Sequence, residues 1–360
     1  MAGVGIARDF MSYGVRRPII ERKKGQYNFR ASDFLTGLSH KYNIDLIYRL
    51  SLHINPRESG KPEDMAAYLN YVKTVVERYD GDDDFGCVLS YPDCYKKGDA
   101  QYPVVSKADG REWGRRHRVH YWEVLKEPEP GRRNRMGNEA GLEPDDSREI
   151  LKKTSEVIHA ADDGAKVIFA GMGPVGKHGG YTEDFYYEQM LKKGGVETFH
   201  IAGVDAFTKT VTEKLERYNK VLNRYKRPKP LWVTQTGVPN RPHRPHRPHQ
   251  KNLFNGGGNP DAQCIYVAKT FTDAFAAGAK KVFWGDFLDN SKAENRPSTI
   301  WDATGLFETE TWKLRPAYFT YKLMATALKN FKSVERISSH AYKFNFSNRS
   351  TIYVILPETG

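Results

Sequence analysis

Leu231-Trp232-Val233-Thr234-Gln235-Thr236-Gly237-Val238-Pro239 is an apolar run that breaks at a glycine. Such a run is typical of a buried parallel strand that ends in a loop. A second segment of the same form, Tyr121-Trp122-Glu123-Val124-Leu125-Lys126-Glu127-Pro128, ends in a carboxylate and a proline. The two segments predict parallel strands that present polar residues where each strand ends.

Short apolar strands alternate with longer amphipathic helices along most of the chain, which indicates a parallel α/β fold. We expect strands at 4–10, 44–52, 120–125, 165–170, 201–207, 230–234 and 281–287. We expect helices at 31–41, 62–79, 147–160, 183–193, 212–225, 261–277 and 316–328. A closed barrel needs eight strands. The prediction is therefore a (β/α)8 TIM barrel over residues 1–330 whose first strand is absent or degenerate, because the chain starts almost directly on a strand.

The tail of the chain has a different pattern. Segments 334–337, 341–346 and 351–356 alternate apolar and polar residues and are separated by turn residues, as in antiparallel strands. We therefore expect residues 331–360 to form a short antiparallel β segment, the start of a small β-sandwich-like domain.

The chain has 360 residues and a formal net charge of +12, which allows attraction to acidic polymers. Its basic pairs, such as Arg16-Arg17 and Arg115-Arg116, are scattered and are not interleaved with aromatic residues. A solvated basic surface is the favoured interpretation, so no specific nucleic-acid partner is expected. A basic protein that binds polyanions remains an alternative.

Cysteine content and hydropathy bear on where the protein works. Cys87 and Cys94 lie in one loop and could form a disulfide, which favours an oxidising, extracellular compartment, whereas Cys264 lies in a helical pattern and is expected to be buried. No signal peptide and no run of 18 apolar residues is present, so a soluble chain without a membrane partner is expected.

The carboxyl ends of the strands carry the chemistry of barrel proteins. In this chain they supply a cation, a candidate acid, an indole and several hydrogen-bonding groups. The residues are Arg8, Asp9, His53, Lys126, Glu127, Thr208, Thr210, Gln235, Trp284 and Asp286. Each residue alone admits a purely structural role, but their common position at strand ends favours a binding or catalytic site.

These segments carry a resemblance to a known family. The 121–128 strand is similar to the Trp-Glu-x-x-Asn-Glu-Pro strand of clan A glycoside hydrolases, the TIM-barrel retaining β-glycosidase superfamily. The 231–237 strand resembles their Trp-x-Thr-Glu-Thr/Ser-Gly strand. Val282-Phe283-Trp284 looks like their eighth strand, and 3–10 followed by 25–29 looks like their second strand and the turn after it. The resemblance runs in order from about residue 3 to residue 330.

The resemblance implies retaining hydrolysis of O-glycosidic bonds in β-linked glycans, with two carboxyl groups about 5–5.5 Å apart. Glu127 would be the general acid/base, and the residue at position 235 would attack the anomeric carbon. Arg8 would bond to that nucleophile and Trp284 would form a platform for the sugar. The residues predicted to bind substrate are Arg8, His53, Lys126, Trp284 and Asp286.

The chain departs from the family pattern at these positions. Gln235 stands where the nucleophilic glutamate is expected, and a neutral amide cannot supply that carboxylate. Lys126 replaces the asparagine that would bind the sugar 2-hydroxyl, and residues 205–210 lack the His and Tyr often found after the sixth strand. The result could be an engineered trap, a natural carbohydrate-binding pseudoenzyme, or an enzyme whose nucleophile comes from elsewhere.

The loop after Gln235 contains a threefold Arg-Pro-His repeat at 241–249. Proline at every third position favours polyproline II, which would place the three histidines on one side. Such a loop could bind a metal weakly or attract acidic sugars, but a solvated loop is the favoured interpretation. We therefore expect an oligo- or polysaccharide partner, with an acidic glycan as one option, and assign no residue to a metal or a cofactor.

Overall fold

The structure is a computed structural model of the whole chain. It describes residues 4–9, 14–55, 60–81, 117–129, 141–169, 171, 183–207, 211–226, 228–240, 259–289, 303–309 and 311–357. Cys87, Cys94, Thr208, Thr210 and the 241–249 repeat lie outside these residues. The chain divides into two compact units, residues 5–202 and residues 203–360 with 1–4.

Within the described residues, seven parallel strands follow one another in the order β1-β2-β3-β4-β5-β6-β7, and helices connect them along the chain. This is the strand order and direction of a (β/α) barrel. The strands are β1 (Ile6–Arg8), β2 (Asp45–Leu50), β3 (Tyr121–Val124), β4 (Lys166–Phe169), β5 (Ile201–Asp205), β6 (Leu231–Thr236) and β7 (Lys281–Trp284). All seven predicted strands are confirmed, with ends one or two residues shorter in most cases.

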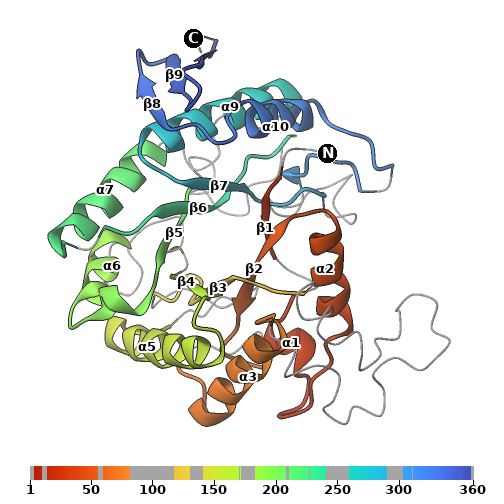
Figure 1. The fold of residues 1–360 in the computed structure, drawn as a ribbon, viewed down its shortest axis with the longest axis vertical. Coiled ribbons are helices and arrows are strands. Elements are labelled where there is room, and N and C mark those ends of the chain that lie inside the picture. Colours follow the sequence, from red (N-terminus) through yellow and green to blue (C-terminus); the bar gives the residue numbers. More distant parts are fainter. Residues whose placement is uncertain are drawn as a thin grey trace. The chain divides into compact units, whose positions relative to one another are not determined.

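In the 5–202 unit, the strands are joined by α2 (Arg30–Lys41), α3 (Met65–Arg78), α5 (Pro144–Ala161) and α6 (Glu183–Leu191), with short helices α1 (Arg17–Ile20) and η2 (Gly195–Thr198). Asp64 caps α3 by accepting from the Ala67 backbone N–H at 2.8 Å, which satisfies one of the helix's unpaired donors. Figure 1 shows α3 and α5 side by side. Apart from their first residues, β2, β3 and β4 are buried, as their apolar sequences predicted, whereas β1 is only half-buried.

The register of this unit determines which side chains meet inside it. Arg8 pairs with Ile47 between β1 and β2, and Arg49 pairs with Glu123 between β2 and β3. Three charged residues, Arg8, Arg49 and Glu123, therefore come from three neighbouring strands of this unit. The buried Tyr48 is hydrogen-bonded to α2, because its hydroxyl lies 2.7 Å from the Thr36 hydroxyl.

The 203–360 unit contains the end of β5, then α7 (Val211–Arg224), β6, α9 (Pro260–Ala276), β7 and α10 (Pro316–Ala327). Asn259 caps α9 by accepting from the Ala262 N–H at 2.7 Å, and Pro260 occupies the first turn, where its missing N–H costs nothing. The pairing of β6 with β7 is irregular between Val233 and Thr236. Cys264 lies on α9 as predicted but is only half-buried, against the hydrophobic core of this unit.

A separate antiparallel sheet follows, of order β10-β9-β8, formed by β8 (Ser333–Arg336), β9 (Ala341–Asn345) and β10 (Thr351–Ile355). This confirms the predicted β segment. Tyr342 and Phe344 face inward and join the hydrophobic core made by α9 and α10, which Figure 1 shows next to β8 and β9. No helix among the described residues is long and apolar enough to span a membrane.

Candidate active site

The predicted site residues of the 5–202 unit occupy the carboxyl ends of three adjacent strands. Arg8 ends β1, His53 follows β2, and Lys126 and Glu127 follow β3. The side chain of Arg8 and the residues His53, Lys126 and Glu127 are all buried, with exposed fractions between 4 and 7%. Because parallel strands end at one edge, the structure brings these four residues to the same edge of this unit.

The backbone after β3 is strained. Leu125 has φ of 62° and Glu127 has φ of 48°, a left-handed conformation that costs a side-chain-bearing residue about 1–3 kcal/mol. The Glu127 N–H donates to the Gly171 carbonyl at 3.2 Å, which anchors this turn to the segment after β4. Strain of this kind is found at sites where a side chain must be held in a defined position.

Arg8 forms an ion pair with Glu123, a residue of β3 that was not among the predicted site residues. The Arg8 Nε donates to Glu123 Oε2 at 2.8 Å, and its Nη2 lies 2.6 Å from the same oxygen. Glu123 is fully buried. The predicted bond from Arg8 to the residue at position 235 stays a prediction. The sequence feature that could have identified Glu123 as a functional candidate is an acidic residue inside an otherwise apolar strand.

His53 contacts its own loop. Its Nε2 lies 3.0 Å from the Gly60 carbonyl oxygen, so this ring nitrogen is suited to carry the proton and donate. With one nitrogen engaged in this way, the ring orientation is set by the loop between β2 and α3. His53 is thus held at the strand end, and its role in binding substrate stays a prediction.

The 203–360 unit carries the second group of predicted residues. Gln235 lies on β6, is 2% exposed, and accepts at its backbone carbonyl from the Ala206 N–H at 2.8 Å. Next to it along the strand, the Thr234 hydroxyl donates to Asp205 Oδ1 at 3.0 Å. Asp205 is a fully buried carboxylate that the sequence analysis did not single out.

Trp284 ends β7 and is buried, with 6% of its surface exposed. Its indole N–H donates to the Thr304 carbonyl at 3.0 Å, and its ring packs edge-on against Tyr266. In this structure Trp284 is part of the hydrophobic core, so its role as a sugar platform stays a prediction. Asp286 is half-buried and has φ of 54°, so a second strained turn follows a strand end.

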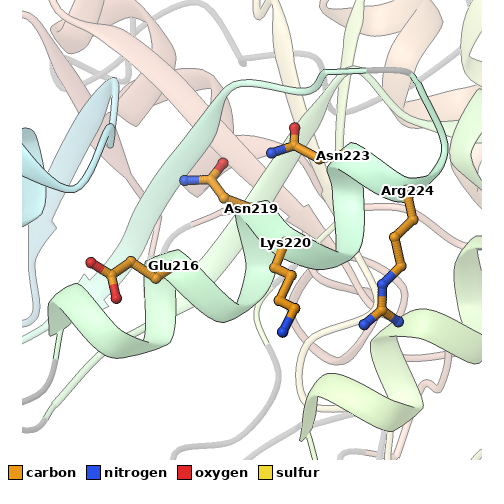
Figure 2. Close-up of a pocket in the computed structure, with 5 residues that line it drawn as sticks. All are labelled: Glu216, Asn219, Lys220, Asn223 and Arg224. Carbon is orange, nitrogen blue, oxygen red and sulfur yellow. The ribbon is translucent and has the colours of Figure 1, made fainter.

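Among the described residues, α7 carries a hollow on its surface. It is lined by Glu216, Asn219, Lys220, Asn223 and Arg224, all from α7. In Figure 2 the side chains of Lys220 and Arg224 extend to the same side of the helix, and no strand-end residue lines the hollow. None of the residues predicted to form the site therefore belongs to this polar helix face. The described residues contain no group of three or more side chains suited to hold a metal.

Comparison with solved structures shows which known proteins share this fold. No protein-family model and no curated protein matches the chain. Among solved structures, a family 39 glycoside hydrolase from the gut symbiont Bacteroides cellulosilyticus WH2 matches 98% of this chain with a TM-score of 0.65 and 16% identity. The match covers 64% of that enzyme, so the chain spans less than two thirds of it.

Two further structures support the same fold. A glucosidase from Croceicoccus marinus matches 99% of this chain and 75% of its own, with a TM-score of 0.58 and 12% identity. A fungal beta-1,4-galactanase matches 89% of this chain and 88% of its own, with a TM-score of 0.56 and 12% identity. The chain therefore has the TIM-barrel fold of these glycoside hydrolases.

Proposed function

We propose that the protein binds β-linked glycans through a glycoside hydrolase site whose hydrolytic activity is impaired at position 235. In the parent reaction, Glu127 is the general acid/base of a retaining mechanism and position 235 is the site of the nucleophile. Arg8, His53, Lys126, Trp284 and Asp286 contact the sugar.

The observation that carries the proposal is the turn after β3. Glu127 is a buried carboxyl, 5% exposed, held by a left-handed backbone at the carboxyl end of a parallel strand. The fold is one in which strand ends carry the catalytic groups. Holding a carboxyl in this way costs free energy, which is typical of functional sites.

Gln235 places a neutral amide where a retaining glycosidase has its second carboxylate, the nucleophile. A retaining glycosidase needs an anionic nucleophile to form the glycosyl-enzyme intermediate, and a neutral amide oxygen does not form it at a useful rate. The chain as it stands is therefore expected to bind a glycan and to cleave it slowly or not at all.

Restoring the carboxylate tests the proposal. Gln235→Glu is expected to raise the release of an aryl leaving group from a panel of aryl β-glycosides by about a hundredfold or more, which corresponds to about 2.7 kcal/mol of barrier. The double variant Gln235→Glu, Glu127→Gln is the matched control and should be silent. A Gln235→Glu variant that stays silent across the whole panel contradicts the proposed parent activity.

A non-catalytic carbohydrate-binding protein is the alternative, favoured by the coincidence of Gln235 with Lys126. It predicts calorimetric binding of an oligosaccharide by the unaltered chain together with a silent Gln235→Glu variant. An acidic glycan is one form of this partner, and an extracellular location suits it. Binding that depends steeply on salt and is indifferent to Glu127 would instead indicate a polyanion-binding protein.

A further inference from the structure

Gln263 is an amide on α9 whose side chain is enclosed in the 203–360 unit, with 0% of the residue exposed. Its Nε2 donates to the Val238 carbonyl at 3.1 Å and to the Thr304 carbonyl at 3.2 Å. Its Oε1 is buried and has no hydrogen-bond partner among the described residues. The opposite orientation of the amide would set this oxygen against both carbonyls, so the two acceptors determine which way the amide points.

The two carbonyls belong to segments that adjoin predicted site residues. Val238 follows Gln235 by three residues, in the loop after β6. The Thr304 carbonyl also accepts the indole N–H of Trp284, at 3.0 Å, where β7 ends. A single NH2 group of Gln263 therefore joins the loop after position 235 to the acceptor that holds the Trp284 indole.

The loop after β6 is bonded to the 303–305 segment on both sides of this contact. The Asn240 N–H donates to the Ala303 carbonyl at 2.7 Å, and Asn240 Nδ2 donates to the Gly305 carbonyl at 3.4 Å. Gln263 holds the carbonyl between them, that of Thr304. The acceptor of the Trp284 indole is thus held in place by several bonds.

Tyr266, one turn further along α9, contacts the same two strand ends. Its hydroxyl lies 3.3 Å from the hydroxyl of Thr236, the residue after Gln235 on β6. Its ring packs edge-on against Trp284, with ring centroids 6.1 Å apart. Gln263 and Tyr266 are three positions apart, so they lie on one face of the helix. This face of α9 therefore contacts the ends of both β6 and β7.

The amide of Gln263 is not the side chain that stability alone would favour. A buried polar atom without a partner costs free energy, and an apolar side chain of similar length would leave no oxygen of this kind. The amide supplies what an apolar side chain lacks, which is two directed donors that fix the spacing of the segments they bind.

We propose that Gln263 is a positioning residue, which sets the Trp284 indole relative to the loop after Gln235 and so determines how tightly a glycan binds. The inference rests on the proposed function, in which Trp284 contacts the sugar. Gln263 does not touch the glycan, and it acts through the Thr304 and Val238 carbonyls. A small displacement of a group that holds a ligand is enough to lower affinity or rate.

Gln263→Met tests the positioning, because it nearly keeps the length of the side chain and removes both donors. The NMR peak of the Trp284 indole N–H, assigned with Trp284→Phe, is expected to shift and to exchange faster with solvent. Thr272→Val is the matched control, since it removes a buried hydroxyl of the same helix that donates to the Ala268 carbonyl, and it should leave the Trp284 peak in place. If Gln263→Met does not fold, Gln263→Asn keeps the amide but shortens its reach, and the same shift is expected. An unchanged Trp284 peak would overturn the inference.

Glycan affinity separates positioning from packing. For an oligosaccharide that the unaltered chain binds, calorimetry is expected to give a Kd about tenfold higher or more in Gln263→Met, and within about twofold of the unaltered value in Thr272→Val. In the Gln235→Glu background, Gln263→Met should raise KM more than it lowers kcat, because it displaces a binding surface and leaves Glu127 unaltered. A shifted indole peak with unchanged Kd would make Gln263 a packing residue and refute only this inference, whereas a failure of the unaltered chain to bind any glycan would refute the proposed function.

Discussion

The ion pair between Arg8 and Glu123 is buried on both sides, with exposed side-chain fractions of 4% and 0%. Two charges taken out of water gain little net free energy from their attraction, because desolvation offsets most of it. Removing one partner is different, since the other buried charge then loses the carboxylate or guanidinium that lies 2.6 Å from it. The pair therefore constrains which residues can occupy positions 8 and 123.

We expect Glu123→Gln to lower the free energy of unfolding by about 3–5 kcal/mol, because Arg8 loses its carboxylate partner. Urea unfolding followed by tryptophan fluorescence measures the change. The matched control is Glu156→Gln, which breaks an exposed pair with Lys152 and should cost less than about 1 kcal/mol. If both variants lose a similar amount of unfolding free energy, the buried pair does not stabilise the fold more than the exposed one.

At the scale of elements, the small sheet is joined to α9 by a buried polar contact. The Tyr342 hydroxyl donates to Asp273, and Lys269 Nζ lies 2.9 Å from the other Asp273 oxygen. Burial, the hydrogen bond and the Asp273 charge together raise the pKa of Tyr342 to about 12 from 10.0. The folded state therefore holds the Tyr342 proton more tightly than the unfolded state does.

This shift has a definite sign. The stability that the raised pKa of Tyr342 contributes is fully present below pH 10 and is lost as the pH rises toward about 12. We expect Tyr342→Phe to be less stable at pH 7 by about 1–2 kcal/mol and to show a smaller further loss between pH 10 and 12. Tyr353→Phe, an exposed tyrosine of the same sheet, is the control. Parallel pH profiles for unaltered and Tyr342→Phe protein would refute this assignment.

The type and order of the elements were predictable because their signals are local. Apolar runs, helical periodicity and glycine or proline breaks lie within 4–18 residues of one another. The short helix α1 was missed because Arg17–Ile20 is a single turn with a proline in it, too short to show periodicity. The predicted boundary near residue 330 between the barrel and the β segment stays a prediction.

At the scale of the whole molecule, the two substitutions that depart from the family pattern lie in different compact units. Lys126 belongs to the 5–202 unit and Gln235 to the 203–360 unit. A loss confined to one residue would be repaired by one reversion, whereas drift of the whole site would not. The two cases differ in whether reverting Lys126 in addition to Gln235 raises the hydrolytic activity further.

We expect the double variant Gln235→Glu, Lys126→Asn to exceed Gln235→Glu alone in kcat/KM by about tenfold, equivalent to about 1.4 kcal/mol. The restored asparagine would bind the sugar 2-hydroxyl, an interaction that strengthens in the transition state. Steady-state kinetics on the best aryl β-glycoside give the comparison. Lys126→Asn alone is the control and should stay inactive, and equal kcat/KM in the single and double variants would argue against drift at position 126.

The sequence by itself determined the strand and helix order and the residues at the strand ends, because both follow from local pattern. Only the tertiary structure decided the partners of the buried charges. Arg8 and Glu123 are separated by 115 positions, and nothing in either segment specifies that they meet. The same holds for Arg49, which faces Glu123 across the β2–β3 pairing, since charge pairing depends on which side chains the strand register brings together.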